Sequence, residues 1–242
     1  MKIKKKHLPS LLKIAVLQPI AYFTCETFGI QMTTASESGS IIACIPIASL
    51  VASILFLQKK PTRFQTSGIC LTVVGVIVCV TAKGFESSFS GIGYIMLCMA
   101  VLSYSLYCVS AEKADKTTSI EKTYVMIACG ACFFATMAIA RSIAAGTVVD
   151  LFMLPFQNTV FLFSILYLGI ASSVLSFVLF NISISSIGTN KASSFVGIST
   201  AVSVLAGVFI LDEKFSAMQC YGTLIILLGV YIANMKSRFF WR

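Results

Sequence analysis

The chain has 242 residues, of which 57% are hydrophobic and only 11% charged, and its mean hydropathy is +0.93. This composition excludes an ordinary soluble domain and predicts a membrane protein. The formal charge of +9 would suit nucleic-acid binding, but the basic residues gather in short loops on one side of the predicted spans, which is typical of membrane topology instead. We therefore expect the lipid bilayer as a partner and no nucleic acid.

Eight stretches of the chain are mainly apolar and about 17–25 residues long, which is enough for a helix to cross about 30 Å of hydrocarbon. We number them helices one to eight. In chain order they are Leu11–Thr33, Ser38–Leu57, Gln65–Ala82, Gly91–Val109, Thr123–Ala145, Thr159–Ile182, Ala192–Leu211 and Ala217–Met235. The sequence thus predicts an all-α membrane protein with eight transmembrane helices.

The basic residues predict how these helices are oriented. If the N-terminus is cytoplasmic, only Lys83, Arg141 and Lys214 lie outside, and the other fifteen basic residues lie inside. This bias follows the positive-inside rule for short loops. It predicts a multi-pass protein of the cell (plasma) membrane with both termini in the cytoplasm.

The chain also repeats itself at an offset of 154 residues. Ser194–Tyr231 aligns without a gap over Ser40–Ile77. The identical pairs include Ser49 and Ser203, Ala52 and Ala206, Leu57 and Leu211, Lys60 and Lys214, Gln65 and Gln219, Gly68 and Gly222, Gly75 and Gly229, and Val76 and Val230. Helix two is five helices before helix seven, an odd number, so the second copy must enter the membrane the other way up. Inverted repeats of this kind are typical of transporters whose solute site lies between two halves.

An inverted repeat of five helices implies ten helices, two more than the eight predicted. Helices four and five have no counterpart in the first half, because subtracting 154 from Gly91–Ala145 gives positions before residue 1. We therefore expect residues 1–83 to form an incomplete first repeat of three helices and residues 84–242 a complete second repeat of five. The 5+5 fold is then shortened at its N-terminal end.

Several of these residues resemble a known family, the EamA-type transporters of the drug/metabolite transporter superfamily. Leu211-Asp212-Glu213-Lys214, followed by Gln219 and Gly222, resembles the family's loop and Gly-containing helix, and Thr33-Thr34-Ala35-Ser36-Glu37 resembles its short turn between the third and fourth helices. The chain departs from the family at three points: Lys59 replaces a usual Glu, Thr200 stands where a Pro would match Pro46, and the first two family helices are absent. The resemblance implies a transporter and does not identify its substrate.

Helix one carries the clearest polar stripe. At about 100° per residue, Gln18, Tyr22 and Glu26 fall on one face. Glu26 is the one acidic residue well inside any predicted span, and an ionisable group at membrane depth is a functional hypothesis by default. The alternative is that Glu26 is solvated near the outer interface or only forms a hydrogen bond with a neighbouring helix. The family's cavity-lining helices correspond to helices one, two, four, six and seven, so the resemblance favours Gln18, Tyr22, Glu26, Tyr107 and Ser176 as substrate-binding residues.

No catalytic, metal-binding or cofactor-binding motif is apparent. The nine cysteines lie in apolar spans and are interpreted as small hydrophobic residues, and His7 is the only histidine. We predict no enzyme, no cofactor and no metal. The expected function is secondary transport of a small organic solute, by export or uptake, through alternating access. The alternative is a truncated, non-transporting membrane protein that retains the fold, and a homodimer is left open.

Overall fold

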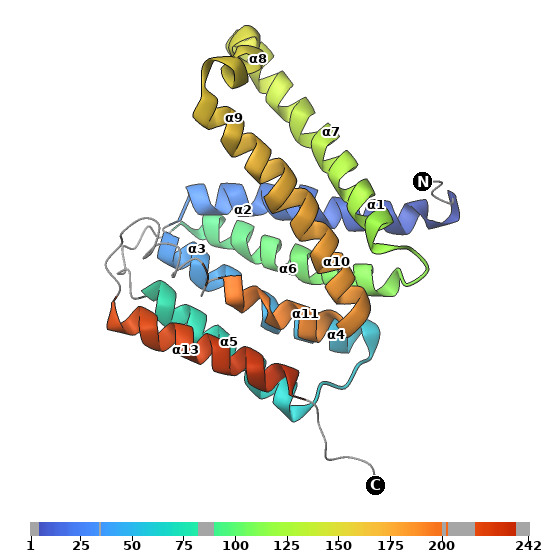
Figure 1. Cartoon of the computed structure of the whole chain (residues 1–242), viewed down its shortest axis with the longest axis vertical. Helices are drawn as coiled ribbons and strands as arrows, with labels where there is room; N and C mark the ends of the chain where they lie inside the picture. The colour runs from blue at the N-terminus through green and yellow to red at the C-terminus, as the bar shows by residue number, and fades with distance from the viewer. Residues whose placement is uncertain (1–4, 34, 82–89, 200–201, 203–215, 236–242) are drawn as a thin grey trace.

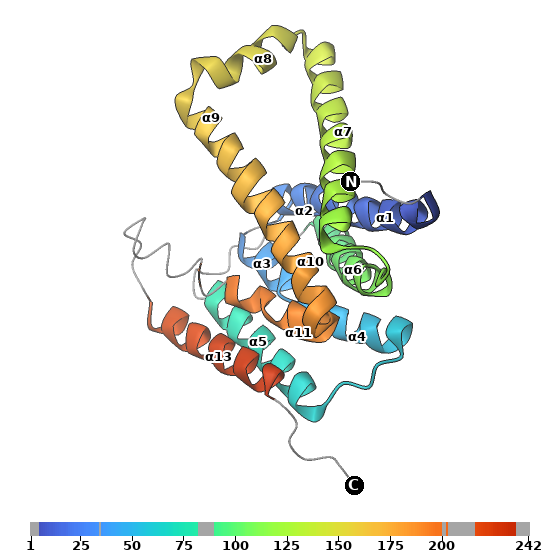
Figure 2. The same ribbon diagram turned by 45° about the vertical axis from the view of Figure 1, so that its right-hand side comes forward.

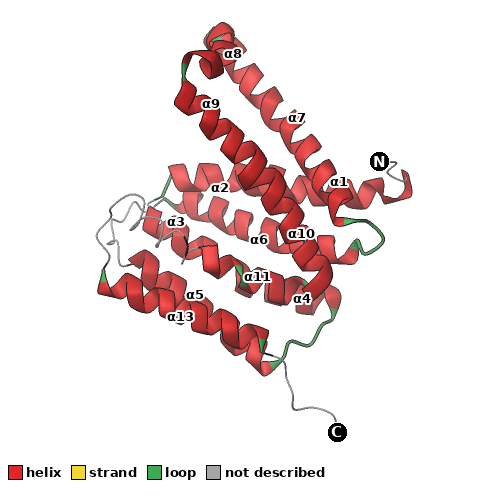
Figure 3. Ribbon diagram, in the orientation of Figure 1, coloured by secondary structure: helices red, strands yellow, loops and turns green. Residues whose placement is uncertain are grey.

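The structure is a computed structural model that describes residues 5–33, 35–81, 90–199, 202 and 216–235. Every regular element in these ranges is helical (Figure 3). The helices are η1 (Lys5–His7), α1 (Leu8–Ala15), η2 (Val16–Ala21), α2 (Tyr22–Gln31), α3 (Ala35–Ile42), α4 (Ile45–Leu57), α5 (Arg63–Thr81), α6 (Gly91–Lys113), α7 (Ser119–Ala145), α8 (Val148–Gln157), α9 (Thr159–Leu166), η3 (Tyr167–Leu175), α10 (Ser176–Ile187), α11 (Thr189–Ser194) and α13 (Ala217–Asn234).

Four helical stretches are long and apolar enough to cross a membrane, and they coincide with predicted helices one, four, five and six. They are Leu8–Gln31, Gly91–Lys113, Ser119–Ala145 and Thr159–Ile187. Predicted helices two, three and eight correspond to α3–α4, α5 and α13. Most of predicted helix seven, including Ser203 and Gly207, lies outside the described residues. The all-helical membrane architecture is therefore confirmed in outline.

Two local features differ from the sequence-based expectation. Predicted helix two is divided into α3 and α4, because Pro46 has no N–H to donate and occupies the first turn of α4, where none is needed. The segment Val148–Gln157 forms α8, although we predicted no helix there. It is apolar but only ten residues long, so the length criterion for a span did not select it.

Irregular wide turns interrupt two of the long spans. In the first span, η2 contains Pro19, and Gln18 has the non-helical angles φ −142° and ψ 116°. The second interruption is η3, which joins α9 to α10. Two hydroxyls there donate hydrogen bonds to carbonyls five residues earlier, Ser173 to Leu168 and Ser176 to Ala171. Adding 154 to the bounds of η2 gives 170–175, which lies within η3.

Helix α6 is the central element of the fold. It packs against α2, α3 and α4, and half of its apolar window is buried. On the far side of α3 and α4, α5 packs against α13 (Figure 1). By contrast, α7 and α9 diverge from this stack and are joined at their far ends by α8 (Figure 2). None of the apolar window of Thr159–Ile187 is buried.

Four glycines let α5 and α13 pack with their backbones in contact. A methyl group at Gly68 would lie 2.6 Å from the carbonyl oxygen of Gly229, and one at Gly75 would lie 2.8 Å from that of Gly222. The pairing runs from Gly68 with Gly229 to Gly75 with Gly222, so the two helices are antiparallel. Small residues permit this close approach of membrane helices.

The glycine contact gives the first prediction. Replacing Gly75 with alanine should destabilise the protein by about 1–3 kcal/mol, because the added methyl would overlap the backbone of α13 and push the helices apart. Thermal unfolding in detergent measures the effect. Gly91→Ala is the matched control, since a methyl at Gly91 meets no atom within 4 Å. Equal melting temperatures for the two variants would contradict the close packing of α5 and α13.

Candidate functional site

A carboxylate and a phenol form the centre of the candidate site. The Tyr22 hydroxyl donates a hydrogen bond to Glu26 Oε1 at 2.7 Å, one turn along α2. Tyr22 is buried, and Glu26 is half-buried. No basic side chain contacts Glu26 among the residues that the structure describes. Because an ionised carboxylate at membrane depth is costly without a partner or a cavity, Glu26 is suited to bind a proton or a cation.

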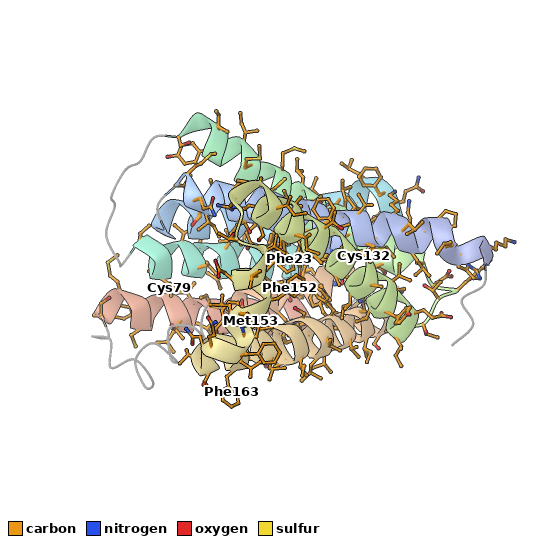
Figure 4. All side chains as sticks on the ribbon, turned by 90° about the horizontal axis from the view of Figure 1, so that it is seen from above. Phe23, Cys79, Cys132, Phe152, Met153 and Phe163 are labelled. Atoms are coloured by element: carbon orange, nitrogen blue, oxygen red, sulfur yellow. The ribbon has the colours of Figure 1, made fainter. Side chains whose placement is uncertain are left out.

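Six aromatic rings from three helices surround the Tyr22 end of this pair. We call them the aromatic cluster: Tyr22, Phe23, Tyr104, Tyr107, Phe177 and Phe180. The ring centroids of Tyr22 and Tyr104 are 5.3 Å apart in an edge-on arrangement, and those of Tyr104 and Phe180 are 5.8 Å apart. Phe23 stacks on Phe177 at 6.3 Å and lies toward the centre of the molecule when seen from above (Figure 4). The cluster thus joins α2 and α6 to α10.

A chain of hydrogen bonds continues from the aromatic cluster into α7 and α10. The Tyr107 hydroxyl donates to Asn181 Oδ1 at 3.0 Å. Asn181 Nδ2 in turn donates to Thr123 Oγ1 at 3.0 Å. The Asn181 side chain is fully buried, so these bonds hold the amide, and with it the Tyr107 ring, in a fixed orientation.

The interruption of the first span places a second polar group near α6 and α7. Gln18 is 2% exposed, and its Oε1 atom has no hydrogen-bond partner. On either side of it, the Leu17 carbonyl accepts a hydrogen bond from Ser103 Oγ at 2.9 Å, and Pro19 packs against Gly130, where a methyl would lie 2.5 Å from the proline ring. The Gln18 amide oxygen is therefore an unsatisfied acceptor buried at the irregular turn.

The structure brings together only some of the predicted site residues. Tyr22 and Glu26 are hydrogen-bonded to each other. Tyr107 belongs, like Tyr22, to the aromatic cluster. Gln18 lies at the irregular turn, so the regular-helix argument that placed it on the Tyr22 face does not hold for it. Ser176 is exposed, and its hydroxyl donates to the Ala171 carbonyl of its own helix at 3.2 Å. Its neighbour Phe177 is the residue that reaches the cluster.

Sequence reasoning did not identify Asn181 or four of the six rings. A signal for Asn181 was present, because it is the one side-chain amide within the predicted span Thr159–Ile182. Amides inside membrane spans commonly bond to neighbouring helices. Phe177, Phe180 and Asn181 also recur at the three- and four-residue spacing that defines one helix face. Apart from this spacing, nothing distinguished Phe177 and Phe180 among the 19 phenylalanines of the chain.

Apolar helices that enclose a polar centre are typical of a multi-pass membrane protein, and comparison with known proteins identifies the family. Residues 1–81 and 91–235 match the EamA-like transporter family. The chain belongs to this family and is a membrane transporter by class.

Named relatives agree with this assignment. The chain is 33% identical to the uncharacterized transporter YcxC of Bacillus subtilis (strain 168) over 97% of its own length and 75% of the relative's. An uncharacterized transporter of Archaeoglobus fulgidus is 24% identical over 97% of this chain and 80% of that protein. One crystal structure resembles the fold with a TM-score of 0.74 and 14% identity, over 94% of this chain and 76% of that one. The relatives' names indicate transporters rather than enzymes.

Proposed function

We propose that this protein is a secondary carrier that moves a small organic solute across the cell membrane by alternating access between two inverted halves. The observation that carries the proposal is the half-buried Glu26 carboxylate, which is bonded to Tyr22 and has no basic partner in the described part of the chain. It adjoins an aromatic cluster to which helices of both halves contribute. Such a site between two halves is where transporters of this architecture bind their solutes.

The contact between α5 and α13 supports the inverted repeat. Adding 154 to Gly68 gives Gly222, and subtracting 154 from Gly229 gives Gly75. The offset therefore converts the contact of Gly68 with Gly229 into that of Gly222 with Gly75, and both contacts are present. Antiparallel helices that exchange their contacts in this way are related by an approximate two-fold axis in the membrane plane, as expected for inverted repeats. The matching wide turns η2 and η3 are also consistent with it.

The chemistry of the site favours a solute with a positively charged amine. Aromatic faces attract cations through their quadrupoles, and the Glu26 carboxylate supplies a counter-charge. The same carboxylate can bind a proton when the solute leaves, which would couple the two fluxes. A proton gradient is then the energy source we expect. The test is whether amines release or take up protons in vesicles that contain the protein, and whether Glu26→Gln removes this effect.

The same two-fold relation indicates which helices the first half lacks. From the first half, α2 packs against α6 and α1 packs against α7, and both α6 and α7 belong to the second half. The counterparts of α6 and α7 would cover α9 and α10, where Val160, Phe163 and Leu179 are more than half exposed. We therefore propose that residues 1–83 are an incomplete first repeat and residues 84–242 a complete second one. A non-transporting, shortened protein is the competing proposal, and the exposed face of α9 and α10 is the observation in its favour.

The orientation of the chain gives a second prediction. Because basic residues favour one side by fifteen to three, a reporter fused after Arg242 should be cytoplasmic, whereas a reporter inserted near Gly84 or Gly146 should be external. Paired phosphatase and fluorescent-protein fusions measure the two locations. A cytoplasmic signal from either loop would contradict the proposed arrangement of eight spans.

A further inference from the structure

Three helices from both proposed halves meet where α4 and α6 end and α11 begins. Lys59, just after α4, forms an ion pair with Glu112 Oε1 on α6. The second carboxylate oxygen, Glu112 Oε2, accepts a hydrogen bond from the backbone N–H of Thr189 at 2.9 Å. One carboxylate therefore holds the loop after α4 and the first residue of α11 at the same time.

Further polar contacts surround this carboxylate. Ser53 on α4 donates to Asn190 Oδ1 on α11 at 2.5 Å, and Thr189 Oγ1 donates to the Cys108 carbonyl at 3.0 Å. Gly188 has φ +81°, a conformation that favours glycine, and a methyl there would lie 3.2 Å from Glu112 Oε1. Because Gly188 has this backbone conformation and no side chain, the turn before α11 can lie close to the ion pair.

Burial makes this contact stronger than an ordinary surface ion pair. An exposed pair contributes little, because water screens both charges. The Glu112 side chain, however, is only 16% exposed, although that of Lys59 is 48% exposed, and charged acceptors make the stronger hydrogen bonds. Loss of the Lys59 charge would leave a mostly buried carboxylate that keeps its contacts with Thr189 but has lost its counter-charge.

We propose that Lys59, Glu112, Thr189 and the Ser53–Asn190 hydrogen bond form the cytoplasmic gate of the carrier. This inference rests on the proposed function, because a gate has meaning only if the two halves rock about a central site. Lys59 and Ser53 belong to the first half, and the other members belong to the second. When the halves separate at this end, these bonds must break, so they favour the state that is closed toward the cytoplasm.

Cys108 provides a native reporter for the gate. It lies one turn before Glu112 on α6, is fully buried, and carries the carbonyl that Thr189 contacts. Intact protein in membranes is treated with N-ethylmaleimide, and modification of the Cys108 peptide is followed over time by mass spectrometry. The exposed thiols of Cys70 and Cys132 act as internal references for reagent access.

Lys59→Gln and Glu112→Gln should each speed Cys108 modification about tenfold, a typical size for a coupling between two states. The exchanged pair Lys59→Glu with Glu112→Lys should slow modification again in part, because it restores the opposite charges but leaves the Thr189 N–H without its acceptor. Lys60→Gln is the matched control, since the neighbouring Lys60 forms no ion pair among the described residues, and it should leave the rate unchanged.

Unchanged rates in both single variants would overturn the gate. Modification in the exchanged pair that is as fast as in the single variants would also overturn it, because loosened packing rather than the ion pair would then be the cause. Gel filtration of each variant identifies misfolded protein. If a variant is misfolded, the milder variant Lys59→Arg is measured in its place, and its Cys108 should be modified slowly. Failure of solute transport in both the 242-residue chain and the extended chain would contradict the proposed function but would leave the labelling result readable.

Discussion

Replacing Glu26 with glutamine is expected to reduce gradient-driven transport by about 30-fold or more, the loss typical when one partner of a buried charge interaction is removed. The protein should still fold and insert, because removal of a charge from a membrane span does not oppose insertion. The physical reason for the loss is that the introduced amide could still accept the Tyr22 hydrogen bond but could neither balance a cation nor carry a proton. Uptake into vesicles that contain the extended chain measures the effect.

The matched control for this variant is Asp150→Asn, which makes the same change at an exposed carboxylate on α8 and should leave transport unchanged. Solute counterflow then separates the two roles of Glu26. If counterflow survives while net transport is lost, Glu26 carries the coupling proton, and if both are lost, it contacts the solute. Full activity of Glu26→Gln would instead mean that Glu26 is solvated at the outer interface.

The second large effect concerns the exposed face of α9 and α10. We expect the coding region directly upstream of Met1, if translated, to give two more apolar spans of about 20 residues each. The 242-residue chain alone should transport weakly or not at all, because that side of the fold is open to lipid, and the extended chain should be active. The chain covers 75% of the length of the YcxC transporter.

Parallel assays of the 242-residue and extended chains at equal membrane amounts provide the comparison. Thr159–Ile187 offers a structural control, because its exposed side chains should become protected from a lipid-soluble labelling reagent in the extended chain only. Unrelated sequence upstream, together with robust transport by the shorter chain, would contradict the proposal that the first repeat is incomplete.

The sequence was sufficient for most of the helices, because long apolar runs have few alternatives in a bilayer. It also predicted the neighbouring positions of Tyr22 and Glu26, since residues four apart share a helix face. It did not predict that the first span is irregular at Gln18. We read the whole span with regular-helix periodicity, although Pro19 removes a backbone donor in its middle and so favours a break.

The part of the site that involves α10 depended on tertiary structure. Ser176 was selected for its polar side chain, but its hydroxyl bonds to its own backbone, and Phe177 makes the contact with α2. Which of two adjacent residues faces a neighbour depends on the wide turns of η3, and these leave no clear mark in the sequence. The ion pair of Lys59 with Glu112 was equally hidden, because its members are 53 positions apart.

The central claim, that this chain carries an amine in exchange for protons at Glu26, is tested most directly in proteoliposomes with a pH-sensitive dye trapped inside. A panel of radiolabelled aromatic and aliphatic amines, with neutral sugars as controls, is added across an imposed pH gradient to the 242-residue and extended chains. The account predicts that at least one amine accumulates saturably and dissipates the gradient, and that Glu26→Gln abolishes both effects. Proton flux and amine uptake that are the same with Glu26→Gln as with the unaltered protein, or absent from both chains, would contradict it.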